Sequence, residues 1–276
     1  RGRSRSAIPQ TGTRMRQPVD TFTEGEANRF FYESLKKDQE KILKLRNNLE
    51  SIPTETPLHL YSKAEQLAYW LNLYNVTVIN EIAKIYPMST LKQLMTGENS
   101  LLDKKLLNVS GVSLSLNDIY NNILLNKYDK EPLIMYGLYQ GYIGGPNIRQ
   151  KAYTGKNVYS ALKDNAVEFI NANRGTQFNG KANTVRVSTF YKRNSMLFPD
   201  FHNDLKKHLV KYAKKGITED IAQADKFVPN IHNWRVTDLY GSTRRYEGAV
   251  ASSAKLDRRK MSFEQIARLK ELMKVR

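Results

Sequence analysis

The sequence predicts an α+β fold: a mostly helical domain with a small β element, flanked by an extended basic arm and a basic tail. Apolar residues recur at helical spacing in several segments. Val185 and Val187 alternate with polar residues after an Asn-Gly turn signal, which predicts a short β-ribbon. The 276-residue chain is 40% hydrophobic, which favours a folded centre. We expect an arm at 1–20, a domain at 21–215 and a tail at 216–276.

The first two helices have clear boundary signals. Residues 24–50 show a helical period, and Pro53 is expected to interrupt it. Ser62 and Glu65 form a capping box in front of a strongly amphipathic helix, which Pro87 ends. This second helix is expected to bury its apolar face in the core.

Later elements follow from similar local patterns. Ser115 and Asp118 repeat the capping pattern. The other expected elements are a buried apolar stretch at 133–143, a helix at 156–173, a helix at 203–214 closed by Gly216, an extended connector at 226–260, and a final amphipathic helix capped by Ser262 and Gln265.

Positive charge is concentrated at both ends of the chain. Lys and Arg number 44 against 27 Asp and Glu, which gives a formal net charge of +17. The arm carries Arg1, Arg3, Arg5, Arg14 and Arg16. We expect these ends to contact an acidic protein face, nucleic acid or anionic lipid, with solvated tails as the alternative. The arm also resembles the remnant of an organelle transit peptide.

Several kinds of chemistry are excluded or unsupported. The chain has no cysteine, so it forms no disulfide, cysteine-ligated zinc site or cysteine nucleophile. None of the histidines, at 59, 202, 208 and 232, forms an H-E-x-x-H pair. No serine elbow, phosphate loop or dinucleotide fingerprint is present. We therefore expect no catalytic residue, metal, cofactor or small-molecule substrate. No apolar run approaches the ~20 residues of a transmembrane segment.

A polar motif lies on the second helix. Trp70, Asn72, Tyr74 and Asn75 stand close together there. Amides at such positions most often tie a helix to loops through buried hydrogen bonds, so we interpret the motif as structural. Substrate binding is the alternative.

The chain resembles a known family over residues 25–215. The resemblance is carried by EQLAYWLNLYNVTVINEIAKIYP at 65–87, LDKKLLNVSGVSLSLNDI at 102–119, EPLIMYGLYQGYIGGPNIRQKAYTG at 131–155 and NANRGTQFNG at 171–180. These segments are similar to domain of unknown function 547. That family occurs mainly in exported bacterial proteins and in plant proteins, and it carries no firmly established activity.

The departures from the family pattern are informative. The resemblance implies Glu-His in place of Tyr120-Asn121, His at Met135, Cys at Gln140, Ser at Tyr142, Cys at Gly145 and Trp-Tyr at Arg193-Asn194. Each of the first six changes removes a group that acts as acid, base, nucleophile or ligand. We interpret these positions as a degenerate family site, unless the family's cysteines are themselves structural.

The leading hypothesis is a non-catalytic, pseudoenzyme-like structural subunit of a large multiprotein assembly. Its partner-binding residues would include the arm arginines together with Arg258, Arg259, Lys260, Ile266, Leu269 and Leu272. A nucleic-acid-binding component of a ribosome-like particle is the first alternative. A residual hydrolase or transferase that uses Glu65, Asp118 and Tyr74 is the second.

Two compartments fit the sequence. The export typical of the similar family, with the absence of cysteine, favours a bacterial cell envelope or periplasm. The arginine-rich start and the high isoelectric point favour a mitochondrial matrix.

Overall fold

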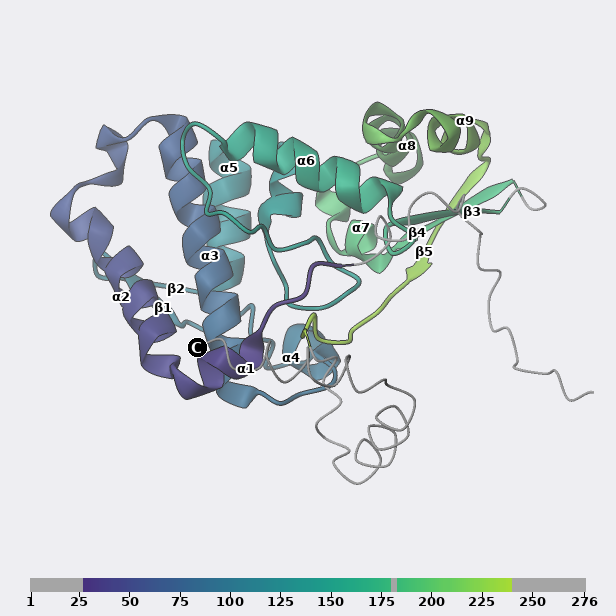
Figure 1. Cartoon of the computed structure of the whole chain (residues 1–276). Helices are drawn as coiled ribbons and strands as arrows, with labels where there is room; N and C mark the ends of the chain where they lie inside the picture. The colour runs from purple at the N-terminus through teal and green to yellow at the C-terminus, as the bar shows by residue number, and fades with distance from the viewer. Residues whose placement is uncertain (1–26, 180–182, 240–276) are drawn as a thin grey trace, which may run out of the picture.

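The chain folds into a mostly helical α+β structure, as predicted, and the computed structural model describes residues 27–179 and 183–239 (Figure 1). The first half contains α1 (Tyr32–Lys37), α2 (Gln39–Glu55), η1 (Leu58–Leu60), α3 (Lys63–Ile85), α4 (Lys92–Thr96), β1 (Leu107–Val109) and β2 (Val112–Leu114). The second half contains η2 (Asp118–Leu124), α5 (Leu125–Lys127), η3 (Pro132–Gly137), α6 (Val158–Asn171), β3 (Thr176–Asn179), β4 (Thr184–Ser188), α7 (Thr189–Arg193), η5 (Ser195–Leu197), α8 (Phe201–Tyr212), α9 (Lys215–Gln223) and β5 (Lys226–Ile231). The η elements are 3₁₀-helices, except that η2 is a π-helix.

Helix α3 forms the core of the fold and confirms the predicted capping box. The Ser62 side chain accepts a hydrogen bond from the Glu65 amide at 3.3 Å, and the Glu65 carboxylate accepts one from the Ser62 amide at 2.9 Å. The helix packs against α1, α2, α6 and η2, and most of its circumference is buried. It ends just before Pro87, as predicted.

The first predicted helix is wrong in its boundaries. Residues 24–50 were expected to form one helix that Pro53 interrupts, but the chain divides at Asp38 into α1 and α2, and Pro53 lies inside α2. Proline has no N–H for the carbonyl four residues before it, which belongs to Leu49. The Tyr69 hydroxyl of α3 donates to that carbonyl at 3.0 Å, so the helix continues through the proline.

The predicted β-ribbon is confirmed, and it gains a third strand that the sequence did not indicate. Strand β3 pairs antiparallel with β4, and β5 pairs parallel with β4 on the other side (Figure 1). The extended connector expected from residue 226 is therefore wrong for 226–231. Gly216 is also misplaced, because it lies in the first turn of α9 and α8 ends at Tyr212.

Residues 232–239, which we call the returning strap, run between residues 89–91 and residues 141–144. The strap joins residues 89–91 through the Leu91 amide and the Trp234 carbonyl at 2.9 Å. On its other side, the Gly144 amide donates to the Asn233 carbonyl at 2.8 Å. A Cβ on Gly144 would lie 2.8 Å from the Asn233 backbone nitrogen, so only glycine permits this approach.

The tail therefore cannot begin at residue 216. Residues 216–239 form α9, β5 and the returning strap, and all three pack on the domain. The buried stretch at 133–143 and the helix near 156–173 are confirmed. The arm arginines, Arg258, Arg259, Lys260, and the final helix with Ile266, Leu269 and Leu272 lie outside the described residues.

Candidate functional site

Five of the eight positions that depart from the family pattern come together in space. We call the group formed by Tyr74, Tyr120, Gln140, Tyr142, Arg193 and Asn194 the tyrosine cluster. The Tyr142 hydroxyl donates to the Gln140 side-chain oxygen and accepts from the Arg193 guanidinium. Gln140 also hydrogen-bonds Tyr74. The Tyr120 hydroxyl donates to the Asn194 side-chain oxygen at 2.6 Å. The phenols and side-chain amides of the cluster are therefore hydrogen-bonded to one another or to Arg193.

The hydroxyls of the cluster stay protonated at neutral pH. Burial raises the pKa of Tyr142 to about 12, even though the neighbouring Arg193 charge favours the ionised form. Burial also raises the pKa of Tyr74 and that of Tyr120 above the ordinary value for tyrosine. A phenol with such a pKa is a poor general base near pH 7.

The other three family-site positions add no reactive group. Met135 is fully buried in η3. Gly145 lies against the Tyr142 ring, where an added Cβ would come within 3.3 Å of a ring carbon. Asn121 lies half-buried on η2.

The two amides of the α3 motif hydrogen-bond loop backbone, which is the arrangement that the structural interpretation predicts. Asn72 donates to the Tyr153 carbonyl at 2.8 Å and accepts from the Tyr153 amide at 3.0 Å. Asn75 donates to the Gly137 carbonyl at 2.9 Å and accepts from the Tyr139 amide at 2.8 Å. Each side-chain amide thus supplies the hydrogen-bond donor and acceptor that loop backbone groups would otherwise lack. These bonds fix the segment that carries Gln140 and Tyr142 against α3.

The three residues considered for a residual enzyme do not meet. Glu65 caps α3 from its exposed end, and its hydrogen bonds to Ser62 lower its pKa. Tyr74 is nine residues further along the helix, about 14 Å away along the axis. Lys105 and the Ser115 amide lower the pKa of Asp118 to about 2. Both carboxylates act as ionised caps.

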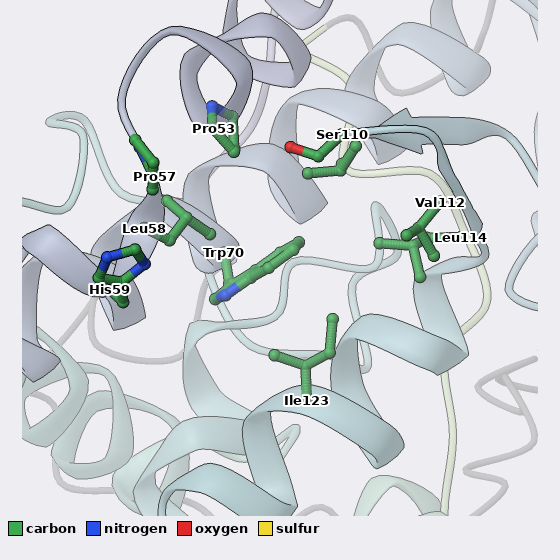
Figure 2. A pocket seen from close by; sticks show the side chains of 10 residues that line it. Pro53, Pro57, Leu58, His59, Trp70, Ser110, Val112, Leu114 and Ile123 are labelled. Atoms are coloured by element: carbon green, nitrogen blue, oxygen red, sulfur yellow. The ribbon is translucent and has the colours of Figure 1, made fainter.

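An apolar groove opens around Trp70, one turn of α3 before Tyr74. Its walls come from the end of α2, from η1, from the β1–β2 hairpin and from η2, and they surround Trp70 (Figure 2). The lining residues are Pro53, Pro57, Leu58, His59, Trp70, Val109, Ser110, Val112, Leu114 and Ile123, and the volume is about 390 Å³. A second cavity of about 230 Å³ shares Leu58 and extends past Glu65 and Asn72.

A tight hairpin places the outer wall of the groove. Ser110 and Gly111 both have positive φ, at 51° and 82°, as a two-residue turn between twisted strands requires. The turn brings Val112 opposite Val109, and Val112 remains 56% exposed. Local sequence patterns do not indicate this groove, because its walls come from separate segments. The Ser110–Gly111 turn is a local signal for one of these walls.

The structure adds two observations about ligands and membranes. Within residues 27–179 and 183–239, no three His, Cys, Asp or Glu side chains are grouped so that they could hold a metal ion. Across the same residues, no helix has the length and apolar character needed to cross a membrane.

Comparison with known proteins gives one match. Residues 58–170 match the model of the family described as "Protein of unknown function, DUF547". The chain is therefore similar to this family over the segment that holds the α3 motif, Gln140, Tyr142 and Gly145. No curated protein and no solved structure matches the chain.

Proposed function

We propose that this chain, which resembles DUF547 over residues 58–170, is a non-catalytic structural subunit of a multiprotein assembly. The single observation that carries the proposal is the tyrosine cluster. Three of the six positions that the resemblance associates with reactive side chains hold Tyr120, Gln140 and Tyr142, whose polar groups are bonded within the cluster.

The protonation states of the cluster support a silent site. General acid–base catalysis at neutral pH is most efficient with a group that titrates near pH 7. The phenols of the cluster have raised pKa values. His208, on α8, is stacked on Tyr136, and burial lowers its pKa to about 4.

The apolar groove supports a role in binding. Val112 and Leu60 are 56% and 67% exposed beside or near it, and Trp70 lies between its walls. Exposed apolar residues that adjoin a hollow are typical of surfaces that contact other proteins. The basic ends of the chain would then reach across neighbouring subunits.

Native mass spectrometry of the full chain purified from its own source tests the proposal. We expect a complex with other polypeptides, whereas a monomer would contradict assembly. Val112→Asp should weaken the complex because it introduces a charge at the groove. Leu43→Asp, at an exposed leucine of α2 outside the groove, is the matched control and should assemble normally.

A second experiment tests the absence of catalysis. The parent chain and a Gln140→Cys variant would be screened together against hydrolase and transferase substrates. We expect no turnover by the parent. Activity in the parent that is lost in Tyr74→Phe would show that the cluster is chemically competent.

The charge of the chain favours nucleic acid as the alternative partner. A net charge of +17 is enough for phosphate contacts. Binding to an oligonucleotide across a range of salt concentrations separates the two functions, because affinity that rests on phosphate contacts falls steeply with salt.

A further inference from the structure

Arg193 is held rigidly at the end of α7. Its guanidinium donates to the Thr189 hydroxyl at 3.0 Å and to the Tyr142 hydroxyl. The central carbon lies 4.8 Å from the centre of the Trp234 ring and 5.5 Å from that of the Tyr142 ring. Two hydroxyls and two aromatic rings therefore fix both the position and the plane of the side chain.

The charge of Arg193 has no carboxylate partner in the described part of the chain. Arg46, Arg149 and Arg174, which are also buried or half-buried, each form an ion pair with a glutamate or aspartate. Arg193 forms none with any residue of 27–179 or 183–239. A half-buried cation is costly without an opposite charge, and cation–π contacts offset only part of that cost.

We propose that Arg193 anchors a carboxylate that a neighbouring protein presents, so that the surface around Arg193 and Trp234 binds an acidic segment. This inference rests on the proposed function as a subunit that binds neighbours. A guanidinium has five N–H donors in one plane, and the two hydrogen bonds within the chain leave the others available. Because the centres of the Tyr142 and Trp234 rings are only 4.6 Å apart, both rings lie on the same side of the guanidinium carbon. Arg193 is half-buried, so part of the group stays exposed, and its paired N–H donors match the two oxygens of a carboxylate.

The same geometry favours an acidic protein over nucleic acid. Trp234 packs on Tyr142, with ring centres 4.6 Å apart, and also carries Arg193. Its ring is therefore engaged within the chain, whereas single-stranded nucleic acid needs free aromatic faces for its bases and a groove of cations along its backbone. A single oriented guanidinium suits one carboxylate.

The test uses the full ¹⁵N-labelled chain and hexaglutamate as the probe at low ionic strength. The chain has two tryptophans, so it gives two indole N–H signals, and Trp234→Phe assigns them. We expect hexaglutamate to shift the Trp234 signal saturably and to leave the Trp70 signal unchanged. Arg193→Gln should weaken the binding about tenfold or more. Arg193→Lys should also weaken it, because an ammonium keeps the charge and lacks the planar pair of donors.

Arg186→Gln is the matched control. Arg186 also lacks a carboxylate partner among the described residues, and it bonds the side-chain oxygens of Asn230 and Gln177. This variant should bind like the parent. The proposal is overturned if Arg193→Gln binds like the parent, if Arg186→Gln weakens binding equally, or if an oligothymidylate of equal charge shifts Trp234 as strongly. Thermal unfolding of each variant checks that it is folded. If Arg193→Gln is not folded, the comparison of Arg193→Lys with the parent tests the proposal instead.

The two proposals fail separately. A monomer in native mass spectrometry contradicts the proposed function whether or not hexaglutamate binds. An unshifted Trp234 signal contradicts the carboxylate site even if the assembly forms through the apolar groove.

Discussion

The tyrosine cluster and the apolar groove share one helix. The side chains of the cluster are bonded to one another, whereas part of the groove remains exposed to solvent. Helix α3 contributes Tyr74 to the cluster and Trp70 to the groove, one helical turn apart. In the cluster, Tyr142 and Tyr120 are bonded to side chains of other elements. In the groove, Val112 is left 56% exposed.

This difference suggests that the cluster serves stability and the exposed groove serves binding. The cluster joins α3, η2, α7 and the segment around Gln140, so it contributes to the folded state. The outer wall of the groove contributes little to the stability of the fold, because Val112 there is largely exposed to solvent. Substitutions should therefore act on stability in the cluster and on association at the exposed wall of the groove, which Val112 forms. The predictions below test this division, beginning with the largest effect.

Tyr142→Ala should destabilise the chain most. The substitution removes a buried ring that packs on Trp234 and leaves Gln140 and Arg193 without their partner. We expect a loss of about 3–5 kcal/mol in the free energy of unfolding, measured by chemical denaturation. Tyr142→Phe keeps the ring and loses only the hydroxyl, so its cost should be about 1–3 kcal/mol. Equal losses in the two variants would contradict a role for the ring.

Gly144→Ala should loosen the returning strap. The new Cβ would lie 2.8 Å from the Asn233 backbone nitrogen, so one of the two segments must move. We expect a cost of about 1–3 kcal/mol and faster amide exchange at residues 141–144. Gly216→Ala is the control, because its Cβ meets open space in the first turn of α9, and it should be neutral or slightly stabilising. Parent-like exchange in Gly144→Ala would show that the strap is not closely packed there.

Acid should lower the stability of the folded chain through His208. Burial lowers the pKa of this imidazole to about 4, with a smaller contribution from Lys211. Between pH 6.5 and about 4, the unfolded state binds a proton that the folded state does not bind, so the free energy of unfolding falls as pH falls. The contribution is complete above pH 6.5, and up to about 3 kcal/mol is lost by pH 4.

The His208→Phe variant isolates this contribution. Phenylalanine keeps the contact with the Tyr136 ring and has no proton to bind. Denaturation of both proteins between pH 7 and pH 4 should show a steeper loss in the parent, because carboxylates such as Asp118 contribute equally to both curves. Parallel curves would mean that His208 titrates normally in the folded chain.

Local sequence patterns predicted the elements that depend on neighbouring residues. The capping box of Ser62 and Glu65 and the amide role of Asn72 and Asn75 depend on a helix and on short polar side chains, so both were predictable. The Val185 alternation likewise predicted a ribbon. These features are encoded within a few residues of one another.

Features that depend on distant partners were not predictable. Strand β5 pairs with β4 about 40 residues earlier, and the returning strap is held by residues 89–91 and 141–144. The continuation of α2 through Pro53 depends on the Tyr69 hydroxyl from another helix. The groove is assembled from six elements. The position of the Arg193 charge depends on Tyr142 and Trp234, which are distant in the sequence.

The smallest effect on stability should come from Val112→Asp in the groove. Val112 is 56% exposed, so a carboxylate there keeps its water, and we expect a change within about 0.5 kcal/mol. Val109, its register partner across the hairpin, is 5% exposed, and Val109→Asp would bury a charge at a cost above about 3 kcal/mol. If denaturation gave similar losses for both, the groove would be part of the stabilising core. If Val109→Asp alone lost stability and Val112→Asp alone lost its partner proteins, the exposed wall of the groove would act in association and not in stability.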